Sequence, residues 1–272
     1  MKDPSTGSGG FGRMTLTVHR AGAGKPLLLV HGLGSSWKSW QLIVPALAAD
    51  REVIAVDLPG HGATPAESDS GTFAGQVRSL DAFLEEQDLV GVDMVGSSMG
   101  GRLVLELARR GRAGAVISLD PGGFWQGWER DYVRTSLGAS IGLLRMIKPS
   151  LPALAANPAS RTALLAQLSA RPWALDPRLV ADELNAFASS TVAVSLTLDL
   201  TEGPMQQGPA APGTRPLVIG WGRSDRLLFP TQAARAVAAF PSASLHWFEG
   251  SGHFPMWDRP DETLRVIREA IA

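Results

Sequence analysis

The sequence of 272 residues lacks cysteine, which excludes disulfide bonds, cysteine nucleophiles and cysteine-bound metal sites. It also lacks an excess of basic residues, because 25 Lys and Arg are balanced by 26 Asp and Glu, giving a formal net charge of −1. Binding to a phosphate backbone depends on such an excess. We therefore expect no nucleic-acid partner.

Long apolar runs are missing as well. No stretch reaches the roughly 18 apolar residues that a membrane-spanning helix needs, so we expect no membrane span and a cytoplasmic location. The N-terminal sequence MKDPSTGSGGFGR has no apolar segment of the kind that a signal peptide carries. We interpret residues 1–13 as a flexible leader or an expression scar, with Met14 as the natural start.

What the chain does contain is an alternation of short apolar runs with longer stretches of helical periodicity. The runs are rich in Val, Ile and Leu and lack polar alternation, as is typical of strands buried on both faces. This order predicts an α/β fold with a mostly parallel sheet and right-handed crossovers. The predicted strands are 27–30, 53–56, 92–95, 115–119, 217–220 and 244–248, and the predicted helices are 36–49, 73–87, 99–111, 231–240 and 261–272.

The alternation stops between residues 122 and 213. That segment has helical patterns at 160–170 and 177–190, separated by prolines, and no convincing strand. A Pro/Gly-rich stretch at 202–216 then leads back to the next apolar run. We expect a core made of residues 14–121 and 214–272, with 122–213 as a helical insertion.

The sequence GSSMGG begins at Gly96, where a predicted strand passes into a predicted helix. It contains the pattern G-x-S-x-G centred on Ser98. A nucleophilic serine must stand on a sharp turn, and the small residues Gly96 and Gly100 allow that turn to form. The N–H groups that open the following helix point to the same place. The pattern predicts that Ser98 is a nucleophile, while a plain glycine turn or a phosphate-binding loop stays open as an alternative.

The sequence HGLG at 31–34 directly follows another predicted strand. Acyl transfer creates an oxyanion that needs preorganised N–H donors. We expect the backbone amides of Leu33 and Met99 to form this oxyanion hole, although an ordinary turn would give a similar sequence. His31 is expected to form structural hydrogen bonds beneath the loop.

Two further residues complete the pattern near the C-terminus. A serine hydroxyl becomes a good nucleophile when an imidazole takes its proton and a carboxylate orients that imidazole. Asp225 and His253 each follow a predicted strand, and the chain order is Ser98, Asp225, His253. The other histidines lie in strands or turns, so His253 is the candidate base. These three residues form a candidate catalytic triad.

Together these motifs resemble those of the α/β-hydrolase superfamily over residues 15–272. The resemblance implies a mostly parallel sheet of about eight strands flanked by helices, with an antiparallel first strand at 15–20. It also implies that the helical insertion follows the sixth strand and forms a cap over the active site. The segments that carry the resemblance are HGLG (31–34), DLPGHG (57–62), GSSMGG (96–101), GRSD (222–225) and GSGHFP (250–255).

The same resemblance assigns Ser98 as nucleophile, His253 as base and Asp225 as acid. Some members of the superfamily carry the acid after the strand that precedes the cap, which here is Asp120. Asp225 is preferred because GRSD matches the commoner pattern. Asp120 is otherwise expected to form a turn ahead of Pro121.

A serine at this position favours acyl chemistry over that of the superfamily members that attack with aspartate. The resemblance implies a serine carboxylesterase that cleaves small to medium, uncharged, moderately apolar esters through an acyl-enzyme intermediate, without a metal or organic cofactor. Carbon–carbon bond hydrolases, lactonases and slow-turnover small-ligand receptors of the same superfamily remain alternatives. The expected partner is a small-molecule ester, and the expected state is a monomer or homodimer.

Specificity is expected to come from side chains close to these motifs. Gly32, Trp37, Trp125 and Phe254 are candidates for the substrate pocket, with packing between insertion and core as an equal alternative for the aromatic residues. Two arginines near the motifs, Arg102 and Arg223, could bind an anionic group, but each is expected to be a solvated surface residue. The sequence therefore contains no cluster of Arg or Lys that would indicate an anionic substrate.

Overall fold

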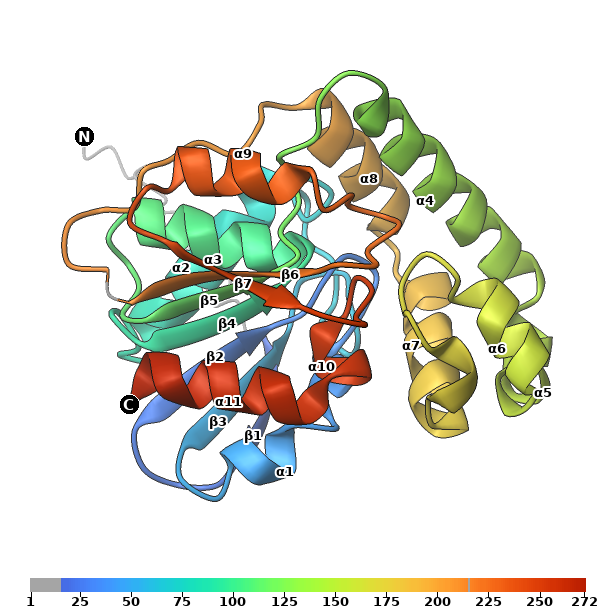
Figure 1. Ribbon diagram of the computed structural model, residues 1–272, viewed down its shortest axis with the longest axis horizontal. Coiled ribbons are helices and arrows are strands. Elements are labelled where there is room, and N and C mark those ends of the chain that lie inside the picture. Colours follow the sequence, from blue (N-terminus) through green and yellow to red (C-terminus); the bar gives the residue numbers. More distant parts are fainter. Residues whose placement is uncertain (1–15, 215) are drawn as a thin grey trace, which may run out of the picture.

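The computed structural model describes residues 16–214 and 216–272. A seven-stranded sheet lies between two layers of helices, and only β1 runs antiparallel to its neighbour (Figure 1). The strand order is β1-β3-β2-β4-β5-β6-β7, so β4 occupies the centre. The strands are β1 (Thr17–Ala21), β2 (Pro26–Val30), β3 (Glu52–Asp57), β4 (Asp93–Ser97), β5 (Val116–Leu119), β6 (Leu217–Gly222) and β7 (Ser244–Phe248).

The sheet differs from the expected one in its size. All the apolar runs identified in the sequence form strands, but the described residues contain seven strands rather than about eight. The long helical insertion consequently follows the fifth strand and not the sixth. The antiparallel first strand begins at Thr17, and Thr15, where it was expected to begin, lies outside the described residues.

Alternating side chains of each strand divide the core into two parts. On β2, Leu28 and Val30 face one layer of helices, while Leu27 and Leu29 face the other. All four are fully buried because helices cover both faces of the sheet. One layer contains α2 (Phe73–Glu86), α3 (Met99–Arg109) and α9 (Gln232–Ala239), and the other contains α1 (Val44–Leu47) and α11 (Pro260–Ile271).

The helix expected at 36–49 is the one predicted core helix that does not form as a single element. Its place is taken by a 3-10 turn, η1 (Trp37–Trp40), and the short helix α1. The break has a chemical cause, because Pro45 has no N–H to bond to the carbonyl of Gln41. Ahead of this break the chain forms a tighter 3-10 pattern, in which the Gln41 N–H donates to the Lys38 carbonyl with an N···O distance of 3.0 Å.

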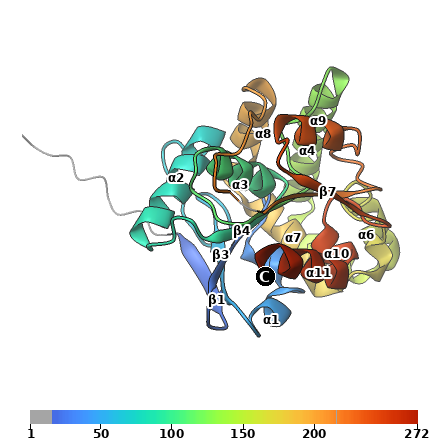
Figure 2. The ribbon, with the colours of Figure 1, turned by 60° about the vertical axis from the view of Figure 1, so that its left-hand side comes forward.

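Among the described residues, the insertion between β5 and β6 consists of helices and the segments that connect them, without a strand. Its helices lie beyond the carboxyl ends of the strands (Figure 1), and Figure 2 shows the same group from another side. Helix α7 contacts η1, and α8 contacts α2, so the insertion rests on the core at two places. Its elements are α4 (Trp128–Met146), η2 (Lys148–Ser150), α5 (Leu151–Ala156), α6 (Pro158–Leu164), η3 (Pro172–Ala174), α7 (Pro177–Ser189) and α8 (Ala193–Glu202).

A single buried carboxylate ties the insertion to the C-terminal part of the core. Asp258, in α10 (Pro255–Asp258), accepts hydrogen bonds from the Ser169 hydroxyl at 2.5 Å, the Ala170 N–H at 2.8 Å and the Gly252 N–H at 2.7 Å. The Arg171 guanidinium donates to the Asp258 carbonyl at 2.8 Å. These bonds hold the 169–171 segment against the loop that precedes His253.

No helix in the part of the chain that the structure describes is both long and apolar enough to cross a membrane.

We predict that Asp258→Ala lowers the free energy of unfolding by roughly 2–4 kcal/mol, because it leaves buried donors without an acceptor. Urea denaturation measures this change. Asp131→Ala is the matched control, since that carboxylate is exposed and its loss should cost less than about 0.5 kcal/mol. Equal effects of the two substitutions would show that Asp258 does not fasten the insertion.

Candidate active site

The carboxyl ends of four parallel strands bring the predicted site residues together. Ser98 follows β4, Leu33 follows β2, Asp225 follows β6 and His253 follows β7. Parallel strands end at the same edge of a sheet, so residues distant in sequence meet there. Ser98 and His253 line one cavity, together with Leu33.

Ser98 stands on a strained turn between β4 and α3. Its backbone has φ 58° and ψ −117°, a conformation that residues other than glycine rarely adopt. A Cβ on Gly96 would lie 2.2 Å from the Gly100 carbonyl oxygen, and one on Gly100 would lie 2.1 Å from the Val30 carbonyl oxygen. The two glycines are therefore required by close packing of the turn, as the sequence pattern predicted.

His253 and Asp225 form a buried hydrogen-bonded pair. The distance from His253 Nδ1 to Asp225 Oδ2 is 2.8 Å, and both side chains are almost fully buried. The other carboxylate oxygen, Oδ1, accepts the N–H groups of Leu227 at 2.8 Å and Leu228 at 3.0 Å. With Nδ1–H donating to the carboxylate, Nε2 is the nitrogen free to accept a proton. Nε2 has no hydrogen-bond partner among the described residues.

Asp120 lies directly beside this pair. One of its oxygens accepts the Gly222 N–H at 2.8 Å, and its carboxyl lies within 4.8 Å of the ligand atoms of Asp225 and His253. Burial and the negative charge of Asp225 raise the pKa of Asp120 well above its usual value. The raised pKa favours the protonated form of Asp120, which can donate a hydrogen bond to Asp225.

Three ligand atoms at such spacing are also able to hold a metal ion. Here Asp225 uses its oxygens for His253 and two backbone amides, and the raised pKa of Asp120 favours its protonated form. A metal ion prefers deprotonated ligands that are not already engaged. The geometry therefore fits a hydrogen-bonded network better than a metal centre.

Leu33 and Met99, whose amides are the predicted oxyanion donors, line a cavity together with Ser98. Met99 is the first residue of α3, so its N–H has no acceptor within the helix. Leu33 lies in a turn closed by a bond from the Ser35 N–H to the Gly32 carbonyl, at 3.3 Å. Neither amide donates to another group in the described part of the chain. Both are thus available to an oxygen next to Ser98.

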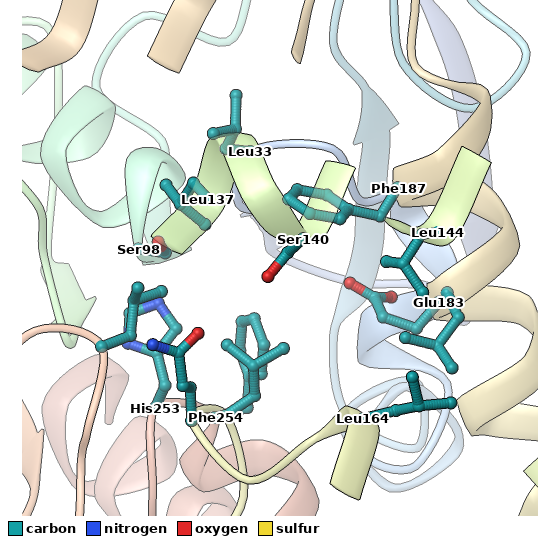
Figure 3. A pocket seen from close by; sticks show the side chains of 14 residues that line it. Leu33, Ser98, Leu137, Ser140, Leu144, Leu164, Glu183, Phe187, His253 and Phe254 are labelled. Carbon is teal, nitrogen blue, oxygen red and sulfur yellow. The ribbon is translucent and has the colours of Figure 1, made fainter. Parts of the chain in front are cut away.

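The cavity at Ser98 is mainly apolar and encloses about 660 Å³, including its opening. Figure 3 shows Ser98 and His253 at one side and the Glu183 carboxyl pointing in from the other. The insertion supplies much of this wall. The apolar lining consists of Leu33, Leu137, Leu144, Leu164, Leu168, Leu184, Phe187, Leu227 and Phe254, and the polar lining besides Ser98 and His253 consists of Ser140, Gln167 and Glu183.

Glu183 is an unexpected carboxyl in this apolar wall. Burial raises its pKa from the usual 4.5 to about 7, and a hydrogen bond from the Ser35 hydroxyl opposes part of that rise. Sequence reasoning missed Glu183, although a signal existed. It occupies the apolar face of α7 beside the buried Val180 and Leu184, where a solvated glutamate is out of place.

The four predicted pocket residues have different positions. Phe254 lines the cavity, and Gly32 borders the nucleophile, since a Cβ there would lie 3.1 Å from Ser98 Cβ. Trp125 lines a smaller, second cavity that also reaches Ser98. Trp37 is placed elsewhere: it stacks on His19 with ring centroids 3.8 Å apart and lines a separate surface depression.

The surface position expected for Arg102 is wrong. Arg102 is buried, and its guanidinium donates to the Pro204 carbonyl at 2.6 Å and to the Gln206 side chain at 3.3 Å. Burial lowers its pKa to about 10, so it stays charged at neutral pH. One nitrogen, Nη1, has no partner among the described residues, and the side chain borders the second cavity. Arg223, in contrast, is half-exposed and pairs with Glu249, as expected for the surface.

His31 forms the structural hydrogen bonds expected of it. Its Nδ1 lies 2.7 Å from the Gly32 carbonyl oxygen, and its Nε2 accepts the Leu58 N–H at 3.0 Å. Burial lowers its pKa to about 4. Burial and the neighbouring His31 lower the pKa of His61 to about 3. Both rings are therefore neutral at pH 7 and hold the loops around Ser98 in place.

Comparison with known proteins gives consistent matches. Residues 27–266 match the sequence profile of the "Alpha/beta hydrolase family". The chain is 26% identical over 287 residues to a 2-hydroxy-6-oxo-6-phenylhexa-2,4-dienoate hydrolase from Burkholderia cepacia, covering 97% of this chain and 93% of that protein. A thermophilic esterase from Thermogutta terrifontis has a similar structure, with a TM-score of 0.72, 20% identity, and coverage of 94% of this chain and 92% of the esterase.

A further relative is longer than this chain. The chain is 26% identical over 243 residues to the dihydrolipoyllysine-residue acetyltransferase component of an acetoin cleaving system from Pseudomonas putida. The match covers 88% of this chain but 61% of that protein. The similarity therefore concerns one part of the larger protein.

We predict that Glu183→Gln stabilises the protein more at high pH than at low pH. The folded-state pKa is raised, so the native state keeps a proton that the unfolded state releases, and stability falls as pH rises from 4.5 to 7. Above that window the full cost is roughly 3 kcal/mol, and the glutamine variant escapes it. Thermal melting at pH 4.5 and pH 8 measures the difference.

The exposed Asp131→Asn is the control for this measurement. Asp131 pairs with Arg134 at 3.2 Å and does not line the cavity, so its substitution should shift both melting curves alike. A constant offset between Glu183→Gln and the wild type at the two pH values would contradict the prediction.

Proposed function

The chain belongs to the alpha/beta hydrolase family, and on this premise we propose that it is a serine hydrolase that cleaves carboxylic esters. The observation that carries the proposal is the strained Ser98 turn, which shares an apolar cavity with the buried His253–Asp225 pair. A serine, an imidazole with a free Nε2 and a fixed carboxylate are the parts that acyl transfer requires. The proposed substrates are small to medium, uncharged, moderately apolar esters.

In the proposed mechanism, Ser98 Oγ attacks the ester carbonyl carbon while His253 Nε2 accepts the hydroxyl proton. Asp225 stabilises the resulting imidazolium through the Nδ1–H bond. The amides of Leu33 and Met99 bind the oxyanion. His253 then gives its proton to the leaving alkoxide, which leaves an acyl group on Ser98. A water molecule deprotonated by His253 attacks this acyl group and releases the acid.

We further propose that residues 122–213 act as the cap of this site. Helices α4, α6 and α7 of the insertion contribute Leu137, Leu164 and Phe187 to the cavity wall. A wall of this kind excludes water and selects the acyl or alcohol group by size. On this proposal, the core supplies the reacting groups and the insertion supplies most of the specificity.

A carbon–carbon bond hydrolase is the second candidate, and Arg102 favours it. The Burkholderia cepacia relative acts, by its name, on a dienoate, which carries a carboxylate. Arg102 lines the smaller cavity together with Ser98, and its Nη1 has no hydrogen-bond partner among the described residues. A buried guanidinium in that position suits a carboxylate on the substrate. The larger, apolar cavity carries no such cation, which is why the ester is preferred.

We predict that p-nitrophenyl esters are turned over by the wild type and that Ser98→Ala loses at least about a thousandfold in kcat. A panel of acyl chain lengths, read by nitrophenolate release, measures this and sizes the cavity. Circular dichroism of the variant checks that it folds. Equal turnover by both proteins would rule out Ser98 as nucleophile. Faster cleavage of a 2-hydroxy-6-oxo-dienoate than of every ester would favour the second candidate.

We predict different outcomes at the two neighbouring aspartates. Asp225→Asn should lower kcat by roughly 10⁴-fold, because an amide cannot stabilise the imidazolium or hold the same tautomer. Asp120→Asn should keep kcat within about tenfold of the wild-type value. A neutral amide preserves both the bond from the Gly222 N–H and a donor toward Asp225. Kinetics of both variants on the best ester decide the assignment. The reverse order of effects would make Asp120 the catalytic acid.

A further inference from the structure

We propose that the end of the larger cavity away from Ser98 is a polar subsite, built by Glu183 and Ser140, that binds an uncharged hydroxyl group of the substrate. The inference rests on the proposed ester hydrolysis and adds a substrate class to it: esters with a hydroxyl group remote from the scissile bond. It is carried by the arrangement of two polar side chains within an otherwise apolar wall.

The position of Glu183 is the first step. The residue is 7% exposed and belongs to the cavity lining, with its carboxyl pointing inward from α7 (Figure 3). Ser98 and His253 lie on the opposite side of the same space. The neighbouring Asp182 faces outward and pairs with Lys38, so the helix places one acidic residue in solvent and the next in the cavity.

The bonding of the carboxyl is the second step. A carboxylate offers about four acceptor positions, and the Ser35 hydroxyl provides one donor within the protein. The cavity lining contains neither lysine nor arginine to pair with it. Burying a carboxyl with so few donors is unfavourable unless a ligand supplies another one. Glu183 is therefore suited to accept a hydrogen bond from the substrate.

Ser140 supplies the complementary contact. It lines the same cavity from α4, and its hydroxyl points into the space that Glu183 also faces (Figure 3). A hydroxyl both donates and accepts, whereas a carboxylate only accepts. A substrate hydroxyl placed between the two side chains can donate to Glu183 and accept from Ser140. Both of its hydrogen-bonding functions are then satisfied.

The choice of an uncharged hydroxyl over an ammonium group follows from the protonation of Glu183. Its pKa of about 7 leaves a large neutral fraction at pH 7. A hydroxyl can bond to either form, but an ammonium group gains an ion pair only with the ionised form. The surrounding wall is apolar, so a cation there would lose its hydration without other partners. An anionic group is disfavoured by the ionised carboxyl.

The test uses aryl esters of matched chain length that end in a methyl, hydroxyl, ammonium or carboxylate group. In one series the end group lies on the acyl side of the ester, and in a second series it lies on the alcohol side. For the wild type, kcat/KM should be about tenfold higher for the hydroxyl ester than for the methyl ester in one series, because a pocket built for a hydroxyl rejects the analogue that lacks it. The ammonium and carboxylate esters should be poorer substrates than the hydroxyl ester.

Variants assign the preference to the subsite. Glu183→Leu should reverse it in favour of the methyl ester, and Ser140→Ala should reduce it. Glu183→Gln should retain hydroxyl selection because the amide still accepts a hydrogen bond. Asp182→Asn, next in sequence but outside the cavity, should leave all ratios unchanged.

A wild-type preference for the methyl ester, or ratios that Glu183→Leu leaves intact, would overturn the proposal. An ammonium ester that is best, increasingly so above pH 7, would overturn the choice of a hydroxyl.

A binding measurement separates this proposal from the proposed activity. Calorimetry measures the binding of a methyl ketone and of its ω-hydroxy analogue to the wild type and to Glu183→Leu. Neither ligand needs to be turned over. Tighter binding of the hydroxy ketone by the wild type alone supports the subsite even if no ester is hydrolysed. Equal binding of both ketones by both proteins overturns the subsite even if esters are cleaved.

Discussion

The close approach of the start of α3 to the end of β2 is the constraint on which the site depends. Gly100 packs against the Val30 carbonyl with no room for a side chain, and this contact sets the distance between two loops that are far apart in the sequence. Between them Ser98 has an unfavourable backbone conformation, and Leu33, Ser98 and Met99 line one cavity. The central position of β4 lets neighbouring strands deliver the remaining residues to the same edge. The stability of the sheet on either side sustains the strain.

Much of this arrangement could be predicted from the sequence, because short-range signals determine it. Apolar runs located the strands, and the glycines around Ser98 indicated a sharp turn. The errors concern how segments are oriented and which distant residues cover them. Periodicity near Trp37 did not reveal how Pro45 would divide the helix, and nothing local to Arg102 showed that residues 204–206 would cover it. Glu183 was missed because its environment is made by separate helices of the insertion.

The acidic residues near the site have different environments. Asp225 is held by a histidine and two backbone amides, whereas burial and the charge of Asp225 raise the pKa of Asp120 beside it. Glu183 lies between these cases, with a pKa of about 7. On the other side of Ser98, Arg102 stays positive within a buried setting. Of the two cavities that Ser98 lines, one thus contains a carboxyl group and the other a guanidinium group.

The contacts around Asp258 have a consequence for how ligands enter and leave. The His253 N–H bonds to the Leu168 carbonyl at 2.9 Å, and Asp258 holds the residues that follow Leu168. A displacement of this segment would pull on the backbone of His253 and disturb its alignment with Asp225. An entrance that opened at this segment would therefore move His253 at the same time.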